Sequence, residues 1–142
     1  MADGCLFCSI VAGETSAHVV LDAPMVVAFL DHRPLFAGHA LVVPRRHVET
    51  LSDLDDHTRD ELFATVQRVA AAVQTATDSA GSFVAMNNVV SQSVPHAHVH
   101  VVPRNPKDGL RGFFWPRTRY AGGEAEAVAD AIRRALAPNA TM

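Results

Sequence analysis

The size and composition of the chain indicate one globular domain acting on a small partner. It has 142 residues, 49% hydrophobic and 19% charged, with a net charge of −3. The chain is therefore long enough to bury a hydrophobic core without the support of disulfides or a metal ion. It also lacks an overall basic field to attract nucleic acid. No apolar run reaches the roughly 18 residues of a membrane helix, and no basic, apolar leader begins the chain. We expect a single cytoplasmic domain over residues 1–142, with no membrane partner.

The N-terminal third of the chain predicts a short helix and three strands. An apolar stretch over Leu6–Ala12, followed by Gly13, is typical of one or two helical turns. Turn-forming residues separate the first two strands and predict a hairpin. The strands are expected over Val19–Asp22, Met25–Leu30 and, after the loop Asp31–Phe36, over Gly38–Val43, where Pro44 stops the last one.

The rest of the chain predicts a long central helix, two strands and a C-terminal helix. Ser52 and Asp55 have the spacing of a capping box. Apolar residues then recur at helical spacing until Gly81: Leu62, Phe63, Val66, Val69, Ala70 and Val73. Strands follow over Ser82–Asn87 and His98–Val102, then an irregular Arg104–Tyr120 and a helix over Glu124–Leu136 with Val128, Ile132 and Ala135 on one face. Strands grouped around one helix predict an α+β fold with an antiparallel five-stranded sheet.

The run His96-Ala97-His98-Val99-His100 is the most informative part of the chain. In an extended chain successive side chains point to opposite faces, so the three histidines share one face and the apolar residues the other. His96 and His100 start about 13 Å apart on an ideal strand, too far for all three to bind one metal comfortably. We therefore expect the three histidines to have different roles.

Two plainer interpretations of this run stay open. The histidines can be satisfied by neighbours on a half-buried strand, although three in register, out of eight in the chain, favour a site. Two histidines at positions i and i+2 on a strand are also a familiar zinc-binding arrangement.

Cys5 and Cys8 are the chain's two cysteines. In a reducing compartment their spacing indicates metal binding or redox chemistry rather than a structural disulfide. The alternative is a pair of reduced cysteines packed as small hydrophobic residues.

The run from His96 to Val102 resembles the signature of the histidine triad family of nucleotide hydrolases and transferases. Other blocks of that family appear in the same order: Phe29-Leu30-Asp31, the run from Gly38 and His39 to His47, and Gln92-Ser93-Val94-Pro95. The resemblance covers about Cys5 to Pro103 and leaves the tail after Arg104 unmatched. It implies a purine nucleotide substrate with a leaving group, such as a phosphoramidate or a dinucleoside polyphosphate, and no redox cofactor.

The resemblance also implies a covalent mechanism. His98 matches the nucleophile of the family, which forms a nucleotidyl-histidine and splits one displacement into two. His100 and His39 match contacts to the phosphate and the leaving group, and Gln92 and Ser93 match neutral donors beside them. The expected catalytic residues are His98, His100, His39 and Ser93.

A nucleotide pocket is implied in the same way. Asp31 matches the carboxylate that accepts hydrogen bonds from the ribose hydroxyls, and Asn87 or Asn88 should reach the ribose or the α-phosphate. The segment before Gln92 is shorter than in many relatives, and Ser91 stands where they commonly have glycine. The residues that match the apolar clamp on the base are Leu6, Phe7, Ile10 and Phe29, and Gln92, Ser93, His98 and His100 complete the expected nucleotide contacts.

A structural zinc ion is the implied cofactor. His47 and His96 match positions that complete a zinc site in some relatives, with Cys5 and Cys8 as the other two ligands. Four protein ligands close the tetrahedron and leave no position for water. His96 can then bind metal while His98 attacks.

The implied assembly is a homodimer, with Phe113-Phe114-Trp115 at the interface, near the partner's site or against their own core. Two other functions stay open. One is a zinc- and nucleotide-binding sensor without turnover. The other is nucleic-acid binding, which we consider unlikely, through basic residues of the tail: Arg104, Lys107, Arg111, Arg117 and Arg119.

Overall fold

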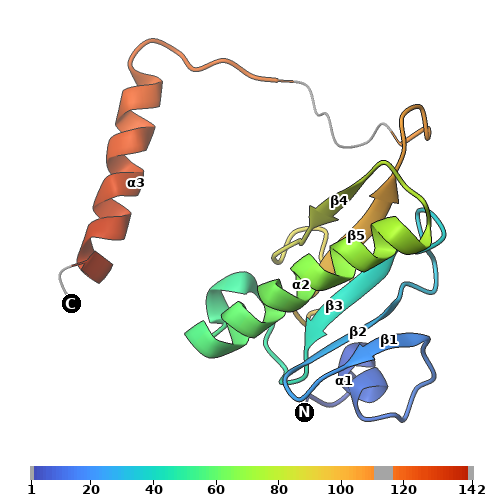
Figure 1. Ribbon diagram of the computed structural model, residues 1–142. Coiled ribbons are helices and arrows are strands. Elements are labelled where there is room, and N and C mark those ends of the chain that lie inside the picture. Colours follow the sequence, from blue (N-terminus) through green and yellow to red (C-terminus); the bar gives the residue numbers. More distant parts are fainter. Residues whose placement is uncertain (1, 111–116, 141–142) are drawn as a thin grey trace. The chain divides into compact units, whose positions relative to one another are not determined.

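The computed structural model describes residues 2–110 and 117–140, with side chains described as far as Leu136 (Figure 1). The chain forms two compact units, 1–108 and 109–142, which are described separately. The elements of the first unit are α1 Leu6–Val11, β1 Val19–Asp22, β2 Val26–Leu30, β3 Ala40–Pro44, the 3-10 turn η1 Leu51–Asp53, α2 Asp56–Ala76, β4 Gly81–Ala85 and β5 Val99–Arg104. Arg111 and Phe113-Phe114-Trp115 lie outside the described residues.

The strands form one antiparallel five-stranded sheet in the order β1-β2-β3-β5-β4. β1 and β2 are the predicted hairpin, and β3 is the central strand. Leu30 lies opposite Ala40 across β2 and β3, and His100 lies opposite Leu41 across β5 and β3. The long helix α2 crosses the sheet (Figure 1). The predicted α+β fold is therefore confirmed.

The alternation of side chains along the strands divides the core into two layers. One layer packs α2 against the strands and includes Val99 and Val101. The other packs Phe7 of α1 against the opposite face of β2 and β3. His98 and His100 alternate with the two valines, so they lie on the α1 side, where the ring of Phe7 contacts that of His98. The predicted placement of His98 and His100 on the face opposite Val99 is confirmed, and both faces are packed.

β1 has the predicted bounds and β2 begins one residue later than predicted, whereas the ends of β3, β4 and β5 differ from the predicted ranges by one or two residues. β3 extends through Pro44, which lies opposite Val26 at the end of the β2–β3 ladder, where a proline is tolerated, and its carbonyl oxygen accepts Nε2–H of His96. β4 ends before Asn87, whose side chain forms a hydrogen bond within the next loop. β5 begins at Val99, so His98 lies just before the strand instead of in it.

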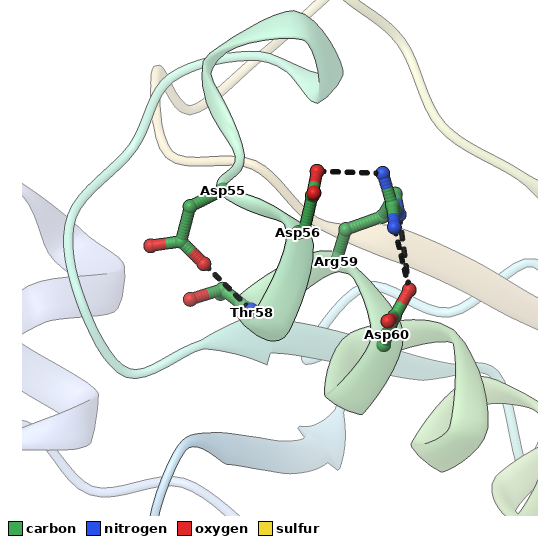
Figure 2. A network of polar contacts seen from close by, with 5 residues as sticks. All are labelled: Asp55, Asp56, Thr58, Arg59 and Asp60. Carbon is green, nitrogen blue, oxygen red and sulfur yellow. Dashed lines mark hydrogen bonds and ion pairs between the residues drawn. The ribbon is translucent and has the colours of Figure 1, made fainter.

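The beginning of α2 differs from the prediction made for its N-terminal cap. The capping box of Ser52 and Asp55 does not form, because Ser52 lies inside η1 and Asp55 is itself the N-cap of α2. The Asp55 carboxylate accepts the N–H of Thr58 at 2.7 Å (Figure 2). Arg59 pairs with two neighbouring carboxylates (Figure 2), those of Asp56 and Asp60.

The end of α2 and one of its faces also differ from the prediction. The helix ends at Ala76, and Asp78 turns the chain with φ +51°, so Gly81 begins β4 instead of ending the helix. The buried stripe is centred on Leu62, and Phe63 lies beside it with 40% of its surface exposed.

Gly38 allows the tight turn that leads into His39 and β3. Its φ is +101°, and a Cβ there would lie 2.7 Å from Cγ2 of Thr77 on the last turn before β4. We expect Gly38→Ala to lower the free energy of unfolding by about 2 kcal/mol or more, because left-handed backbone strain adds to the steric overlap. Urea denaturation measures this; a change below about 0.5 kcal/mol would show that the turn relaxes freely.

The second unit contains α3 Glu124–Ala140, which extends beyond the predicted Glu124–Leu136. Ala121 N–H donates to the carboxylate of Glu124 at 3.0 Å and closes the start of the helix. Two residues of the predicted apolar face, Val128 and Ile132, are 41% and 56% exposed. Among the described residues of both units, no helix combines the length and apolar character needed to cross a membrane.

Candidate active site and metal cluster

The segment that carries the histidines is fixed by its backbone. Ala97 N–H donates to the carbonyl oxygen of Val48 at 2.7 Å, which ties the residues before β5 to the chain leaving β3. His100 is then the second residue of β5. His96 and His98 are buried in this arrangement, with 0% and 2% of their surfaces exposed.

Hydrogen bonding determines which nitrogen of His98 carries the proton. Nδ1 lies 2.7 Å from the carbonyl oxygen of His96. A carbonyl oxygen only accepts, so Nδ1–H donates and a neutral His98 has a bare Nε2. Burial lowers the pKa of His98 below 6.5, with the hydrogen bond to His96 and the charge of Asp31 acting in the opposite direction. The ring is therefore held neutral near pH 7, with its lone pair on Nε2.

His39 determines the tautomer of His100. Leu35 N–H donates to Nδ1 of His39 at 3.1 Å, so a neutral His39 carries its proton on Nε2. That Nε2 lies 2.9 Å from Nδ1 of His100. Nδ1 of His100 accepts this hydrogen bond, and a neutral His100 then has its proton on Nε2. One backbone N–H thus fixes the orientation of two imidazoles.

Both of these rings are also held neutral. Burial lowers the pKa of His39, opposed by the charge of Asp31. Burial, assisted by His98 and His39, lowers the pKa of His100 to about 4. His39 is only 3% exposed, so most of its contacts are with the protein.

Asp31, His39 and His100 place potential metal ligands within 4.8 Å of one another. The hydrogen bond from Leu35 argues against a metal ion there, because it puts the proton of a neutral His39 on Nε2, the atom facing the other two residues. A protonated nitrogen cannot bind metal. These three residues are therefore better described as a hydrogen-bonded polar cluster.

A cavity of about 740 Å³ opens beside this cluster, a volume ordinary for a small-molecule site. It is lined by five of the predicted nucleotide-binding residues: Leu6, Phe7, Ile10, Phe29 and Asp31. Leu6 is 40% exposed, whereas Phe7 and Phe29 are 4% and 2% exposed and form the buried wall behind it. The Asp31 carboxylate accepts the N–H of Arg33 at 2.9 Å and keeps its other oxygen near His39.

A larger groove, of about 1010 Å³, lies at the start of α2. Its lining includes Arg45, Arg46 and Asp55 but none of the predicted site residues. Arg45 pairs with Asp22, and Arg46 pairs with Asp55, so these charges are already matched. Cavity size alone therefore does not identify the site.

In the loop between β4 and β5, side chains that were predicted to contact the nucleotide form hydrogen bonds within the protein instead. The Gln92 amide accepts Val89 N–H at 2.9 Å and donates to the carbonyl oxygen of Glu49 at 2.6 Å. The Asn88 side chain accepts Leu51 N–H at 2.7 Å. The structure thus gives both side chains a role in holding the loop.

Three other residues of this loop were singled out from the sequence. Asn87 donates to the carbonyl oxygen of Ser91 at 3.2 Å. Ser91 has φ +62°, the region that glycine adopts most readily. Ser93 is exposed.

Cys5, Cys8, His47 and His96 form a separate cluster, with one ligand atom of each within 4.8 Å of the others. α1 supplies the cysteines, Cys5 as its N-cap. His96 Nε2–H donates to the carbonyl oxygen of Pro44 at 2.8 Å, so a neutral His96 points a bare Nδ1 at the cluster. Burial lowers the pKa of His96, which favours the neutral form that binds metal.

The distances in this cluster fit a tetrahedral zinc ion. With Zn–N near 2.0–2.1 Å and Zn–S near 2.3 Å, a tetrahedron has edges of about 3.3 Å between nitrogens and about 3.6 Å between nitrogen and sulfur. The two Nδ1 atoms of His47 and His96 are 3.2 Å apart. Nδ1 of His96 lies 3.5 and 3.6 Å from the sulfurs of Cys5 and Cys8, and Nδ1 of His47 lies 3.3 Å from Cys8 Sγ.

Sequence reasoning missed the groups that orient these rings, because they are backbone atoms: Leu35 N–H and the carbonyl oxygens of His96 and Pro44. It also passed over His18 and His32, which line the cavity. Both are visible among the eight histidines, but neither belongs to a motif.

Comparisons with known proteins find a matching family and solved structures of the same fold. A family model described as HIT domain matches residues 12–107. A solved member of the HIT family from Bacillus subtilis is 30% identical, with a TM-score of 0.85, and covers 93% of this chain and 96% of its own. A Zn-bound histidine triad family protein from Mycobacterium smegmatis is 32% identical, with a TM-score of 0.72 and coverages of 93% and 97%.

A curated relative adds a named activity. Adenosine 5'-monophosphoramidase hnt1 of Schizosaccharomyces pombe is 29% identical over 130 residues, which is 90% of this chain and 95% of that protein. The match of the family model to most of the chain, together with the shared fold, shows that the protein belongs to the HIT, or histidine triad, family.

Proposed function

We propose that this chain is a nucleotide-phosphate hydrolase or nucleotidyl transferase acting on purine nucleotide phosphoramidates or dinucleoside polyphosphates. The observation that carries the proposal is the buried His98, whose Nδ1–H is engaged by His96 and whose Nε2 is left bare. A neutral, oriented imidazole is what nucleophilic attack on phosphorus requires. The named activity of the yeast relative supports an adenosine phosphoramidate as first substrate.

The proposed first step forms a bond between Nε2 of His98 and the α-phosphorus, while the bond from phosphorus to the leaving nitrogen breaks. His100 Nε2–H donates to an oxygen of the phosphoryl group and stabilises the charge on it. The Ser93 hydroxyl is proposed to pass its proton to the leaving nitrogen, which departs as ammonia or an amine, and the water that attacks in the second step returns a proton to Ser93. Water then attacks the same phosphorus, releases the nucleoside monophosphate and restores His98; another acceptor in place of water gives transfer.

His39 is proposed to act through His100. Its two ring nitrogens are both engaged, with Leu35 N–H and with His100. In this role it keeps the His100 proton on Nε2, facing the phosphoryl group, instead of contacting the substrate itself.

The cavity beside Asp31 is the proposed nucleoside site. Leu6 and Ile10 would contact the base, with Phe7 and Phe29 as the wall behind them, and the Asp31 carboxylate would accept hydrogen bonds from the ribose hydroxyls. The loop contacts of Asn87, or Asn88, and Gln92 to the nucleotide stay predictions, and they require those side chains to exchange the partners described above.

Zinc bound by Cys5, Cys8, His47 and His96 is proposed as a structural cofactor. The tetrahedral spacing of the four ligand atoms supports it. When bound, the ion supplies no chemistry to the reaction and holds α1 to the segment before β5. A homodimer in the cytoplasm remains part of the proposal, and light scattering tests the assembly.

A turnover assay separates this proposal from the alternatives. Purified protein should release AMP from adenosine 5'-phosphoramidate repeatedly, whereas a sensor module binds AMP and releases at most one equivalent. For nucleic-acid binding, one of the five basic residues, Arg104, is already paired with Asp108. A steep salt dependence of oligonucleotide binding, without turnover, would favour that function instead.

The pH dependence of nucleotidylation follows from the buried histidines. Burial lowers the pKa values of His98 and His39 below 6.5 and that of His100 to about 4. We expect the single-turnover rate to stay high at pH 6.5 and to fall only below it, as the three rings take up protons, that of His100 near pH 4. Rapid-quench measurements from pH 4 to 8 test this.

The same pKa shifts affect stability, so the folded fraction needs its own measurement. A histidine whose folded-state pKa is depressed binds fewer protons than in the unfolded chain, so stability falls as pH drops below 6.5. Circular dichroism at each pH gives the correction. A corrected acid limb centred at or above pH 6.5 would contradict the burial of the catalytic rings.

A further inference from the structure

Phe7 links the proposed nucleophile to the metal cluster. Its ring lies 5.0 Å from the ring of His98 at an interplanar angle of 84°, and 6.0 Å from that of His96 at 74°. Only 4% of its surface is exposed. Most of the Phe7 ring therefore contacts protein and only a small part faces the cavity, which is a different position from that of the exposed Leu6.

His98 needs more than its hydrogen bond to hold one orientation. The contact from Nδ1–H to the carbonyl oxygen of His96 fixes one atom of the ring, and the ring can still tilt about that bond. A perpendicular aromatic ring in contact with it restricts this tilt, since edge-to-face packing has a preferred geometry. Phe7 provides that contact from α1, while the ring of His100, also 5.0 Å away, contacts His98 from β5 at 65°. Nε2 is the atom whose direction depends on these contacts.

We propose that Phe7 is a positioning residue that holds the imidazole of His98 with Nε2 directed at the phosphorus of the bound nucleotide. The catalytic consequence rests on the proposed function, whereas the effect on the His98 ring does not. A misplacement of about 1 Å in a reacting group is enough to cost up to 10²-fold in rate.

The position of Phe7 depends in turn on the cysteines beside it. Cys5 caps α1 and accepts Cys8 N–H at 3.4 Å, with Phe7 on the turn between them. Both sulfurs face Nδ1 of His96. The contacts that fix the sulfurs of Cys5 and Cys8 therefore also fix the turn of α1 that places Phe7 against His98.

The test compares Phe7→Leu with Val27→Ala. Val27 is buried in the same layer of the core, 3% exposed, but does not line the cavity. We expect Phe7→Leu to slow the nucleotidylation rate constant at saturating adenosine 5'-phosphoramidate by about tenfold or more, with AMP affinity changed by no more than about threefold. Val27→Ala should lower the melting temperature but leave the rate constant within about twofold. Phe7→Met, which fills the space without a ring, serves if the leucine variant does not fold.

The outcomes separate three accounts. If Phe7→Leu weakens AMP binding and leaves the rate constant unchanged, Phe7 is only a wall of the cavity and the proposal is overturned. If Val27→Ala slows the step equally, the effect is general softening of the core, and positioning by Phe7 is also overturned.

Nuclear magnetic resonance of the His98 ring nitrogens gives a readout that needs no turnover. Zinc-loaded wild type and Val27→Ala should show one sharp set of His98 signals with Nδ1 protonated, and Phe7→Leu should show broadened or doubled signals. Unchanged signals in Phe7→Leu would overturn the positioning role. If wild type forms no nucleotidyl-enzyme, the proposed function fails, and the ring signals still decide the role of Phe7.

Discussion

Replacement of His98 by alanine should reduce turnover of adenosine 5'-phosphoramidate by roughly 10³-fold or more. The imidazole supplies the attacking Nε2, and no neighbouring ring can replace it: His96 directs its bare Nδ1 at the cysteines, and His100 accepts from His39 through Nδ1. Positioning and charge stabilisation by the remaining groups account for the residual rate. Steady-state kinetics with AMP release as the signal measures the effect.

His57→Ala is the matched control for this substitution. His57 is exposed at the start of α2 and lies outside the proposed site, so its loss should change turnover by no more than about twofold. His98→Ala should keep its far-ultraviolet circular dichroism and bind AMP. A folded His98→Ala protein with more than a tenth of wild-type turnover would remove His98 as nucleophile.

Replacement of Cys8 by serine should have the largest effect on stability. Cys8 is 2% exposed, and its sulfur lies within 3.6 Å of Nδ1 of both His47 and His96. A hydroxyl is a poor ligand for zinc, and loss of the ion removes binding free energy that contributes to folding. We expect zinc content to fall from about one per chain to less than a tenth, and the melting temperature to drop by about 10 °C.

Elemental analysis and thermal melting, on protein purified without chelator, check both parts. Val27→Ala is the control, because it disturbs the same layer of the core without removing a ligand, and it should keep its zinc. Wild-type protein with less than a tenth of a zinc per chain, unchanged on adding Zn²⁺, would remove the metal site. The cysteines would then be small buried hydrophobic residues.

The fold was predictable from the sequence mainly because the alternation of apolar residues along the strands and their helical spacing along α2 match the residues that are buried. Val99 and Val101 pack under α2 while His98 and His100 face α1, as strict alternation requires. The same rule failed at the strand's start, since β5 begins at Val99. Alternation reports which face a side chain takes, and it does not report where inter-strand hydrogen bonding begins.

The start and end of α2 show what local patterns miss. Ser52 and Asp55 have the spacing of a capping box, but Asp55 is the cap residue and Ser52 belongs to the preceding turn. Gly81 looked like a helix stop, whereas Asp78 turns the chain with a positive φ before it. Several residues in this stretch can cap or turn a chain, and tertiary packing selects among them.

The chemistry of the site was only partly readable. The Cys5 and Cys8 spacing indicated metal binding or redox chemistry, and the structure brings His47 and His96 to the two cysteines as the resemblance implied. The histidine tautomers could not be predicted from the sequence. They depend on backbone groups, Leu35 N–H and the carbonyl oxygens of His96 and Pro44, and every residue has such groups whatever its side chain. The sequence also gave no indication that the Gln92 side-chain amide forms hydrogen bonds with the backbone of Val89 and Glu49.

Intact-mass analysis of acid-free, rapidly quenched enzyme tests the central claim most directly. Wild-type protein mixed with adenosine 5'-phosphoramidate should gain the mass of one adenylyl group, and peptide mapping should place it on His98. His98→Ala should gain none, and Phe7→Leu should gain it more slowly. An adduct on another residue, or turnover by wild type without any adduct at the shortest times, would contradict the covalent mechanism.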